Sequence, residues 1–350
     1  MSKVFEPAEL GGMTLRNHIV RSATNDYGGN EDGTVSAFQM DIYEKLAKNE
    51  VGLIITGHAC VCPDGRNDPR QNGMYDDRFI EGQRALTDMV HSYGAKIVQQ
   101  INHSGAKCPP AVIGGTPAAP SAVEVMPGIL PRELTVEEIV RIEDDFAAAA
   151  VRSKAAGYDG VQIHCAHGYL FSQFIDPAHN KRTDAYGGSI ENRFRIVAET
   201  IAKVRAAVGP EYPVLLKIHT NVAEGDEGFE AELVEMLRTA QALGVTAAEL
   251  SGFDFAKQPR AKEGRLFFFE RAARVCKAVS LPCILVGGIR TIEEMDRVLD
   301  AGLVLVSMAR PFVCQPDIIP ILKAGGASKC IGCFGCFKIY QTKGKRCVLH

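Results

Sequence analysis

The sequence predicts an α/β protein with a (β/α)8 barrel, or TIM barrel. Short apolar and β-branched runs recur along the 350 residues, and segments with helical periodicity separate them. A doubly wound open sheet is the alternative, but no G-x-G-x-x-G sequence follows the first run, which argues against a dinucleotide-binding turn. The hydrophobic content of 46% can fill the large core that a barrel needs.

Eight segments have the composition of buried parallel strands. Eight strand–helix alternations in roughly 300 residues favour a closed barrel over an open sheet. The predicted strands span residues 18–23, 51–59, 95–101, 159–164, 213–219, 245–252, 282–288 and 303–309.

Helix start and stop signals lie between these strands. In two segments a Thr is followed three residues later by Glu, which is the spacing of a capping box, and in a third a Ser is followed by Asn. Gly lies at the expected end of each segment. The three helices are predicted over 135–157, 189–209 and 291–302.

The charge balance excludes several classes of partner. With 39 basic and 42 acidic residues the net charge is −3, so we expect neither a nucleic-acid nor a membrane-surface partner. The first residues, MSKVFEPAEL, hold no apolar targeting segment, and no apolar run is long enough to span a bilayer. We therefore expect a cytoplasmic protein that acts on a small molecule.

Polar side chains collect where the fourth predicted strand ends. In the stretch GVQIHCAHGYL, residues 160–170, His164, His167 and Tyr169 follow an apolar alternation. The ends of barrel strands form the catalytic face, where two imidazoles can hold an oxygen and a phenol can donate a proton. Structural histidines are the alternative; for a zinc site, no Asp, Glu or Cys lies at helical spacing to complete the ligands.

The sequence resembles the old yellow enzyme family of FMN-dependent ene-reductases. The longest resembling block is HCAHGYLFSQFIDPAHNKRTDAYGGSIENRFR; NHIVRSATND, GLIITGHACVCPDGR, QQINHSGAK, LVGGIR and LVSMARPFV resemble other barrel segments of the family, in the same order. The resemblance covers nearly the whole chain. It implies an FMN-binding barrel over residues 1–325, followed by a cysteine-rich tail over 326–350.

The resemblance also implies a set of flavin-binding residues. Gln100 would bond the pyrimidine edge of the flavin, and Lys217 would face N1 and O2, with a salt bridge inside the barrel as its alternative. Gly287 and Gly288 would let backbone N–H groups approach the phosphate, and Arg310 would add a charge to it. The full set is Ser22, Ala23, Thr24, His58, Gln100, Lys217, Gly287, Gly288, Ala309 and Arg310.

Two further loops depart from a simple reading of the family. Asn25 stands where the family often has a Thr or Cys that tunes the flavin, which leaves the redox potential and substrate preference open. Arg182, Asp184 and Arg193 look catalytic but are predicted to form a charged clamp that fixes the loop after the fourth strand.

The resemblance implies a reaction in two halves. NADH or NADPH would reduce the flavin, which would then pass a hydride to the β-carbon of an electron-poor alkene. His164 and His167 would hold the activating carbonyl, and Tyr169 would protonate the α-carbon. Three alternatives remain: flavin-dependent amine oxidation, a flavin-free phosphate-binding aldolase or isomerase that uses Lys217 as a Schiff-base amine, and a non-catalytic electron-transfer subunit. Relatives are often oligomeric, so a homo-oligomer is expected.

The eleven cysteines fall into two groups. Seven are scattered, and in a reducing compartment they are expected to be small buried hydrophobes. The tail holds the other four in a C-x2-C-x2-C-x10-C pattern, which suits an iron–sulfur cluster or a four-thiolate zinc. These are Cys330, Cys333, Cys336 and Cys347. The tail is similar to that of trimethylamine dehydrogenase and dienoyl-CoA reductase, which implies a [4Fe–4S] cluster; free thiols remain the third option. A cluster here is expected to serve a separate electron-transfer protein partner.

Overall fold

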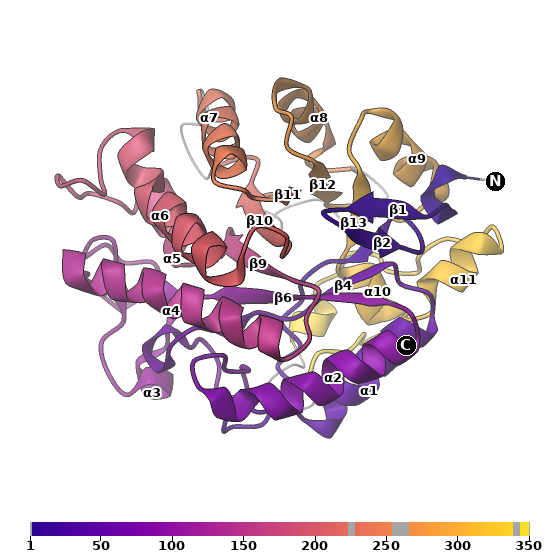
Figure 1. Ribbon diagram of the computed structural model, residues 1–350, viewed down its shortest axis with the longest axis horizontal. Coiled ribbons are helices and arrows are strands. Elements are labelled where there is room, and N and C mark those ends of the chain that lie inside the picture. Colours follow the sequence, from indigo (N-terminus) through magenta and orange to yellow (C-terminus); the bar gives the residue numbers. More distant parts are fainter. Residues whose placement is uncertain (1, 223–227, 254–265, 339–343, 350) are drawn as a thin grey trace.

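The computed structural model describes residues 2–222, 228–253, 266–338 and 344–349. Parallel strands form a closed ring in it, with helices outside (Figure 1). The ring runs β4-β3-β13-β12-β11-β10-β9-β6, and a pairing of β4 with β6 closes it. The strands are β3 (Ile19–Arg21), β4 (Leu53–Ile55), β6 (Lys96–Asn102), β9 (Gly160–Cys165), β10 (Val214–His219), β11 (Ala247–Ser251), β12 (Cys283–Val286) and β13 (Leu305–Met308).

This ring confirms the predicted (β/α)8 barrel. Each of the eight predicted strand segments corresponds to one barrel strand, and β6 and β9 extend one residue beyond their predicted ends. The second segment, 51–59, is split: the chain leaves the ring after β4, and the short β5 (Ala59–Cys60) then pairs with the far end of β6. The break matters for the site, because it places His58 between the two pieces.

The described helices lie around the ring. They are α1 (Ala37–Lys48), α2 (Ile80–Ser92), α3 (Pro110–Ile113), α4 (Val136–Ala155), α5 (Leu170–Ile175), α6 (Ile190–Val208), α7 (Phe229–Ala242), α8 (Phe269–Ala278), α9 (Ile292–Asp300), α10 (Arg310–Cys314) and α11 (Ile318–Lys323). The three predicted helices are confirmed as α4, α6 and α9. Thr135 and Thr291 form complete capping boxes, whereas Ser189 caps α6 without the reciprocal bond.

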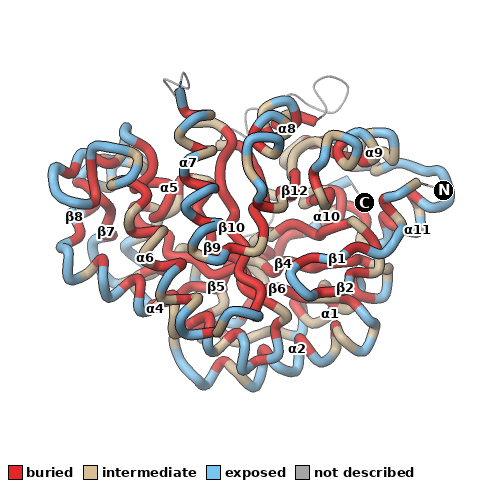
Figure 2. The backbone as a smooth tube through the Cα atoms, turned by 45° about the horizontal axis from the view of Figure 1, so that its top comes forward, coloured by how far each residue is buried: buried red, intermediate tan, exposed pale blue. Residues whose placement is uncertain are grey.

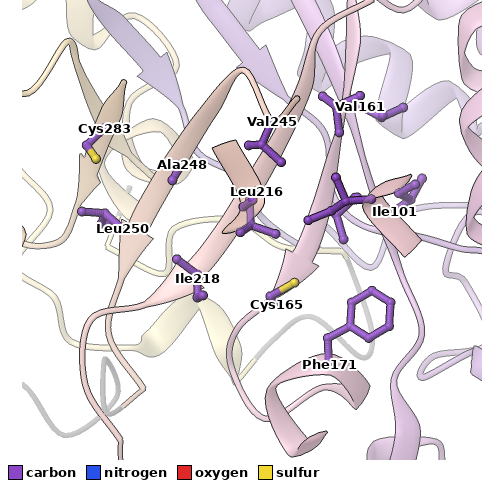
Figure 3. Close-up of a cluster of buried hydrophobic side chains, with 14 of the residues drawn as sticks. Ile101, Val161, Cys165, Phe171, Leu216, Ile218, Val245, Ala248, Leu250 and Cys283 are labelled. Carbon is purple, nitrogen blue, oxygen red and sulfur yellow. The ribbon is translucent and has the colours of Figure 1, made fainter. Parts of the chain in front are cut away.

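Two separate apolar cores lie on the two faces of the barrel sheet. Alternate residues of each strand point outward and pack against the helices; Figure 3 shows Leu216 and Ile218 of β10 in this layer, and Cys165 of β9 near Phe171 of α5. The strands are therefore buried on both sides, while the outer helix faces are exposed (Figure 2). None of the helices that the structure describes could cross a membrane.

The inner face changes character along the barrel axis. At the N-terminal ends of the strands it is apolar and packs against an antiparallel hairpin of β1 (Ala8–Leu10) and β2 (Met13–Leu15), which closes that end of the barrel. Two residues further along five of the strands the inward side chains are polar, namely Ser22, Gln100, Lys217, Glu249 and Ser307. The apolar layer consists of Val20, Leu53, Ile55, Val98, Leu215, Ala247, Ile284 and Leu305.

Candidate active site

A cavity of about 1100 Å³, part of it open to solvent, lies at the C-terminal ends of the barrel strands. All the predicted catalytic residues and all the predicted flavin-binding residues except Gly288 line it. They are His164, His167, Tyr169, Ser22, Ala23, Thr24, His58, Gln100, Lys217, Gly287, Ala309 and Arg310. Residues that the sequence did not single out for this site complete the wall: Tyr27, Lys107, Ser251, Phe267, Phe268, Val286, Phe337 and Lys345.

The floor of this cavity is a buried ion pair. Lys217 on β10 and Glu249 on β11 are register neighbours, and their Nζ and Oε2 atoms lie 3.1 Å apart. Lys217 also donates to Ser22 Oγ at 2.7 Å. The salt bridge that was the alternative for Lys217 is therefore present, and the same lysine still lines the cavity.

Glu249 is the functional candidate that sequence reasoning missed. It is fully buried and accepts from Ser22, from Ser307 at 2.7 Å and from Gln162 at 3.0 Å; Gln162 in turn accepts from Gln100. Burial opposes its ionisation, but the Lys217 ammonium and the three donors hold the pKa of Glu249 below its usual value. Its position two residues before Ser251 on an inward row was the available signal.

The histidines His164 and His167 of the cavity are neutral. Burial, followed by the charges of neighbouring groups, lowers the pKa of His164 and of His167 well below the usual value. His164 Nδ1 accepts the backbone N–H of Ala166 at 3.3 Å, so the proton of its neutral ring is on Nε2. His167 Nε2 lies 2.9 Å from Ser251 Oγ, and the two imidazole centroids are 5.2 Å apart.

Tyr169 lies beside these imidazoles. Its ring centroid is 5.0 Å from that of His164 and 5.0 Å from that of His58. Its hydroxyl oxygen lies 3.1 Å from Asn67 Nδ2 and 3.3 Å from His58 Nε2. Burial raises the pKa of Tyr169 to about 12, so the phenol carries its proton throughout the neutral range.

The chemistry of the wall suits a flavin. Asn25 uses its Oδ1 to accept from the backbone of Tyr27, and its Nδ2 is buried with no hydrogen-bond partner among the described residues. The cavity is large enough for an aromatic ring system, and an amide donor without a partner on its wall can donate to a flavin carbonyl. Gly287 and Gly288 have φ of +146° and +77°, and a side chain at either position would collide with the segment of Leu266, Phe267 and Phe268. Gly287 and Arg310 both line the cavity.

Comparison with known proteins identifies the family. A model of the NADH:flavin oxidoreductase / NADH oxidase family matches residues 3–328. The chain belongs to this family. It is 36% identical over 366 residues to an NADH oxidase of Thermoanaerobacter brockii, covering 99% of this chain and 56% of that protein. The chain thus spans about half the length of that curated relative.

Solved structures agree with the family assignment. Morphinone reductase in complex with tetrahydroNAD superposes with a TM-score of 0.82 at 27% identity, covering 94% of this chain and 92% of that one. An old yellow enzyme homologue from Zymomonas mobilis gives a TM-score of 0.80 at 26% identity, covering 92% and 93%. The expected likeness to the old yellow enzyme family is confirmed.

The charged loop after β9 is structural, in two parts rather than one. Arg182 binds Asp184 in a bidentate pair and donates to the backbone carbonyls of Pro120 and Leu134. Arg193 instead binds Glu232 at 2.6 Å. The predicted clamp therefore includes Arg182 and Asp184, and Arg193 ties α6 to α7.

The tail cysteines converge on a second, small cavity. Cys330, Cys333, Cys336 and Cys347 line it together with Cys314, whose Sγ lies 3.7 Å from that of Cys347. Cys314 was expected among the scattered buried cysteines; it is buried, but it belongs to this group. The backbone N–H groups of Gly335 and Leu349 lie 3.4 and 3.5 Å from the sulfurs of Cys333 and Cys347.

The sulfurs of this group are not gathered as tightly as the ligands of one zinc ion. Four thiolates on one zinc lie roughly 3.8 Å apart, given Zn–S bonds of about 2.3 Å. Among the described residues, three or more possible ligands within 4.8 Å of one another occur only at Cys62, Asp64 and His103. His103 Nδ1 accepts the backbone N–H of Gly105, and Asp64 pairs with Arg141 at 2.8 Å. That trio is therefore held by hydrogen bonds and a salt bridge, with a proton on the nitrogen that a metal would need.

Proposed function

We propose that this chain is an FMN-dependent NAD(P)H oxidoreductase that reduces the activated carbon–carbon double bond of a small molecule. The observation that carries the proposal is the position of two neutral imidazoles and a protonated phenol, His164, His167 and Tyr169, over a cavity whose floor carries the Lys217 cation. These are the groups needed to hold a carbonyl oxygen and to supply a proton.

The residues around the cavity would hold FMN at its polar edges. Asn25 and Gln100 offer amide donors to the ring, Lys217 faces it as a cation, and Arg310 with the Gly287–Gly288 backbone would take the phosphate. Bound FMN would supply hydride exchange between the nicotinamide and the substrate. A solved neighbour's complex with tetrahydroNAD supports a nicotinamide donor.

The chain's own groups would polarise and protonate the substrate. His164 Nδ1 already accepts the backbone N–H of Ala166, so its Nε2–H is available to the substrate. His167 provides a second imidazole beside it. Neutral donors are suited to a carbonyl, whose oxygen becomes more negative as the double bond accepts the hydride. Tyr169 would then give its proton to the adjacent carbon.

Replacement of Tyr169 by Phe tests this assignment. In anaerobic stopped-flow measurements, flavin reduction by NADH or NADPH should stay near the parent rate, and reoxidation by an enone should slow by roughly 10²–10⁴-fold. Tyr75→Phe is the matched control, because Tyr75 packs on Phe79 and does not line the cavity, and it should leave both steps near parent values. Equal losses in the two steps of Tyr169→Phe would contradict the assignment.

The rival chemistries predict different behaviour. A Schiff-base aldolase needs a free amine, whereas Lys217 is paired with Glu249 and bonded to Ser22. Such a barrel would also be colourless. Amine oxidation would appear as turnover of amines and not of enones in anaerobic panels. A protein that shows no flavin absorbance and takes up no added FMN would refute the whole proposal.

We propose further that the tail holds a [4Fe–4S] cluster through Cys330, Cys333, Cys336 and Cys347, and that it exchanges electrons with a protein partner. Phe337 and Lys345 of the same tail line the flavin cavity, so the two sites adjoin. Iron and sulfide analysis should find about four of each per chain. Cys336→Ala should lose the iron, while Cys276→Ser, in α8, should retain it.

The division at residue 325 and a homo-oligomeric state also remain proposals. The tail packs on the barrel through bonds such as that from the Lys345 backbone to Asp26 at 2.7 Å, so truncation at 325 should expose the cavity and weaken FMN binding. Light scattering of the purified chain would give its oligomeric state.

A further inference from the structure

We propose that His58, held in one tautomer by Gln71, acts together with Asn67 to donate hydrogen bonds to the Tyr169 oxygen, so that the tyrosine proton is directed into the cavity. This makes His58, Gln71 and Asn67 positioning residues for the alkene step. The inference rests on the proposed function and adds to it how the proton donor is oriented. His58 was expected only to line the flavin.

The argument begins with the orientation of the Gln71 amide. Its Oε1 accepts the backbone N–H of Asn67 at 2.8 Å, and its Nε2 donates to the backbone carbonyl of His58 at 3.1 Å. Exchange of the two amide atoms would place donor against donor and acceptor against acceptor. Gln71 is buried, so no solvent relieves such a mismatch. Its Nε2 is therefore a donor.

The same Nε2 lies 2.8 Å from His58 Nδ1. Because that nitrogen faces a donor, it carries no proton, and the proton of the neutral ring must be on Nε2. Burial, followed by the positive charges of Lys345 and Lys217, lowers the pKa of His58 to about 3, so the ring is neutral under working conditions. His58 Nε2–H is then a donor that points at the Tyr169 oxygen, 3.3 Å away.

The phenol oxygen thus receives two donors. Asn67 Nδ2 lies 3.1 Å from it, and His58 Nε2 takes the other side. With the Asn67 amide in this orientation, in which its Oδ1 has no hydrogen-bond partner among the described residues, neither neighbour accepts, so the hydroxyl hydrogen of Tyr169 points elsewhere, and the cavity beside His164 is the open direction. The two donors would also stabilise the negative charge left on the oxygen when the proton departs.

The proton balance follows from these roles. The Tyr169 O–H bond breaks as the C–H bond forms on the substrate carbon, and the hydride delivered in the same half-reaction supplies the electron pair. The N–H groups of neutral His58 and of the Asn67 amide are far too weakly acidic to transfer a proton to Tyr169. Water must therefore return the proton to Tyr169. His58 orients the acid and does not replace it.

The first test reads the tautomer directly. Two-bond ¹H–¹⁵N correlation spectra of the oxidised protein, labelled with ¹⁵N-histidine, should show His58 protonated on Nε2 alone, with the signal assigned by its loss in His58→Gln. Protonation on Nδ1, or on both nitrogens at neutral pH, would overturn the inference. This measurement does not depend on any substrate, so it stands even if the parent protein reduces no alkene.

The second test uses Asn67→Asp, which replaces the donor by an acceptor that can take the tyrosine proton. Alkene-driven reoxidation should slow by at least about tenfold, with flavin reduction unchanged. In a Tyr169→Phe background the same substitution should cost nothing more. Asn72→Asp is the matched control, because Asn72 lies on the same loop and bonds Gly33, Thr34 and Gln39 instead. An unchanged Asn67→Asp, or a loss that persists without the Tyr169 hydroxyl, would refute the roles.

Discussion

Glu249→Gln offers the sharpest test of the buried ion pair at the barrel centre. The substitution keeps the shape of the side chain but leaves the Lys217 ammonium, which is 2% exposed, without its counter-charge. Removing one partner of a buried pair costs about 3–5 kcal/mol. The Glu249 carboxylate accepts hydrogen bonds from Ser22, Ser307 and Gln162, whereas the glutamine amide has one oxygen acceptor and one nitrogen donor. Local hydrogen bonds can therefore recover little of the lost free energy.

This free energy converts into a measurable melting shift. At about 2.1 cal/mol/K of unfolding entropy per residue, a chain of this length should melt about 4–7 °C lower. Differential scanning calorimetry at pH 7, with matched flavin content, gives the shift. A second variant that also replaces Lys217 by Met should recover part of the loss, because it removes the uncompensated charge together with its partner.

The pH dependence of the same deficit provides an independent check. Toward acid the difference between parent and variant should narrow, because the parent loses its pair once the pH falls through the lowered pKa of Glu249. A deficit below 1 kcal/mol at pH 7, or strict additivity with Lys217→Met, would refute the reasoning.

Three further outcomes follow from the structure. The alkene half-reaction should be flat from about pH 6.5 to 9, because the pKa values of His164 and His167 are lowered and that of Tyr169 is raised to about 12; a titration step near pH 6.5 would contradict neutral imidazoles. Asn25→Asp should weaken FMN binding by roughly 10–100-fold in fluorescence titrations, because it removes a buried donor, and Asn25→Thr should bind more tightly than the Asp variant. Thr135→Ala should cost about 1 kcal/mol in urea denaturation, since it removes the N-cap of α4; no change would mean that the cap is already replaced by solvent.

The barrel could be predicted because each strand is buried on both faces. Such strands read as continuous apolar runs, and eight of them have distinct boundaries in the sequence. The N-terminal hairpin β1–β2 could not be predicted in the same way, because its strands are three residues long and its role depends on which end of the barrel it closes. Local propensity carries no information about that contact.

Site residues could be predicted where a polar or charged side chain interrupts an apolar strand, because such a residue is unusual there. His164 and Lys217 interrupt apolar runs, so they were visible at once. Glu249 interrupts a run in the same way, but its meaning depends on the register that sets it beside Lys217. Asn67 and Gln71 lie on a loop, and only the tertiary fold brings Asn67 to Tyr169, 102 positions later in the chain, and Gln71 to His58. The tail cysteine pattern likewise omits Cys314, because that residue joins the group from α10.

The inward row of β10 explains why the cation can be placed here at all. Leu215, Lys217 and His219 are spaced two residues apart on β10 and point into the barrel. Along this strand the inward side chains therefore change from the apolar layer to a cation and then to a neutral imidazole. An ammonium between an apolar layer and a neutral imidazole has no solvent to stabilise it, and the neighbouring strand must provide the compensating charge at the same height. Parallel register does this by setting Glu249 beside Lys217. Lys217 can then face the negatively charged edge of a flavin ring while Glu249 balances its charge inside the barrel. Substitution of Glu249 should therefore change both the stability of the protein and the redox potential of the flavin.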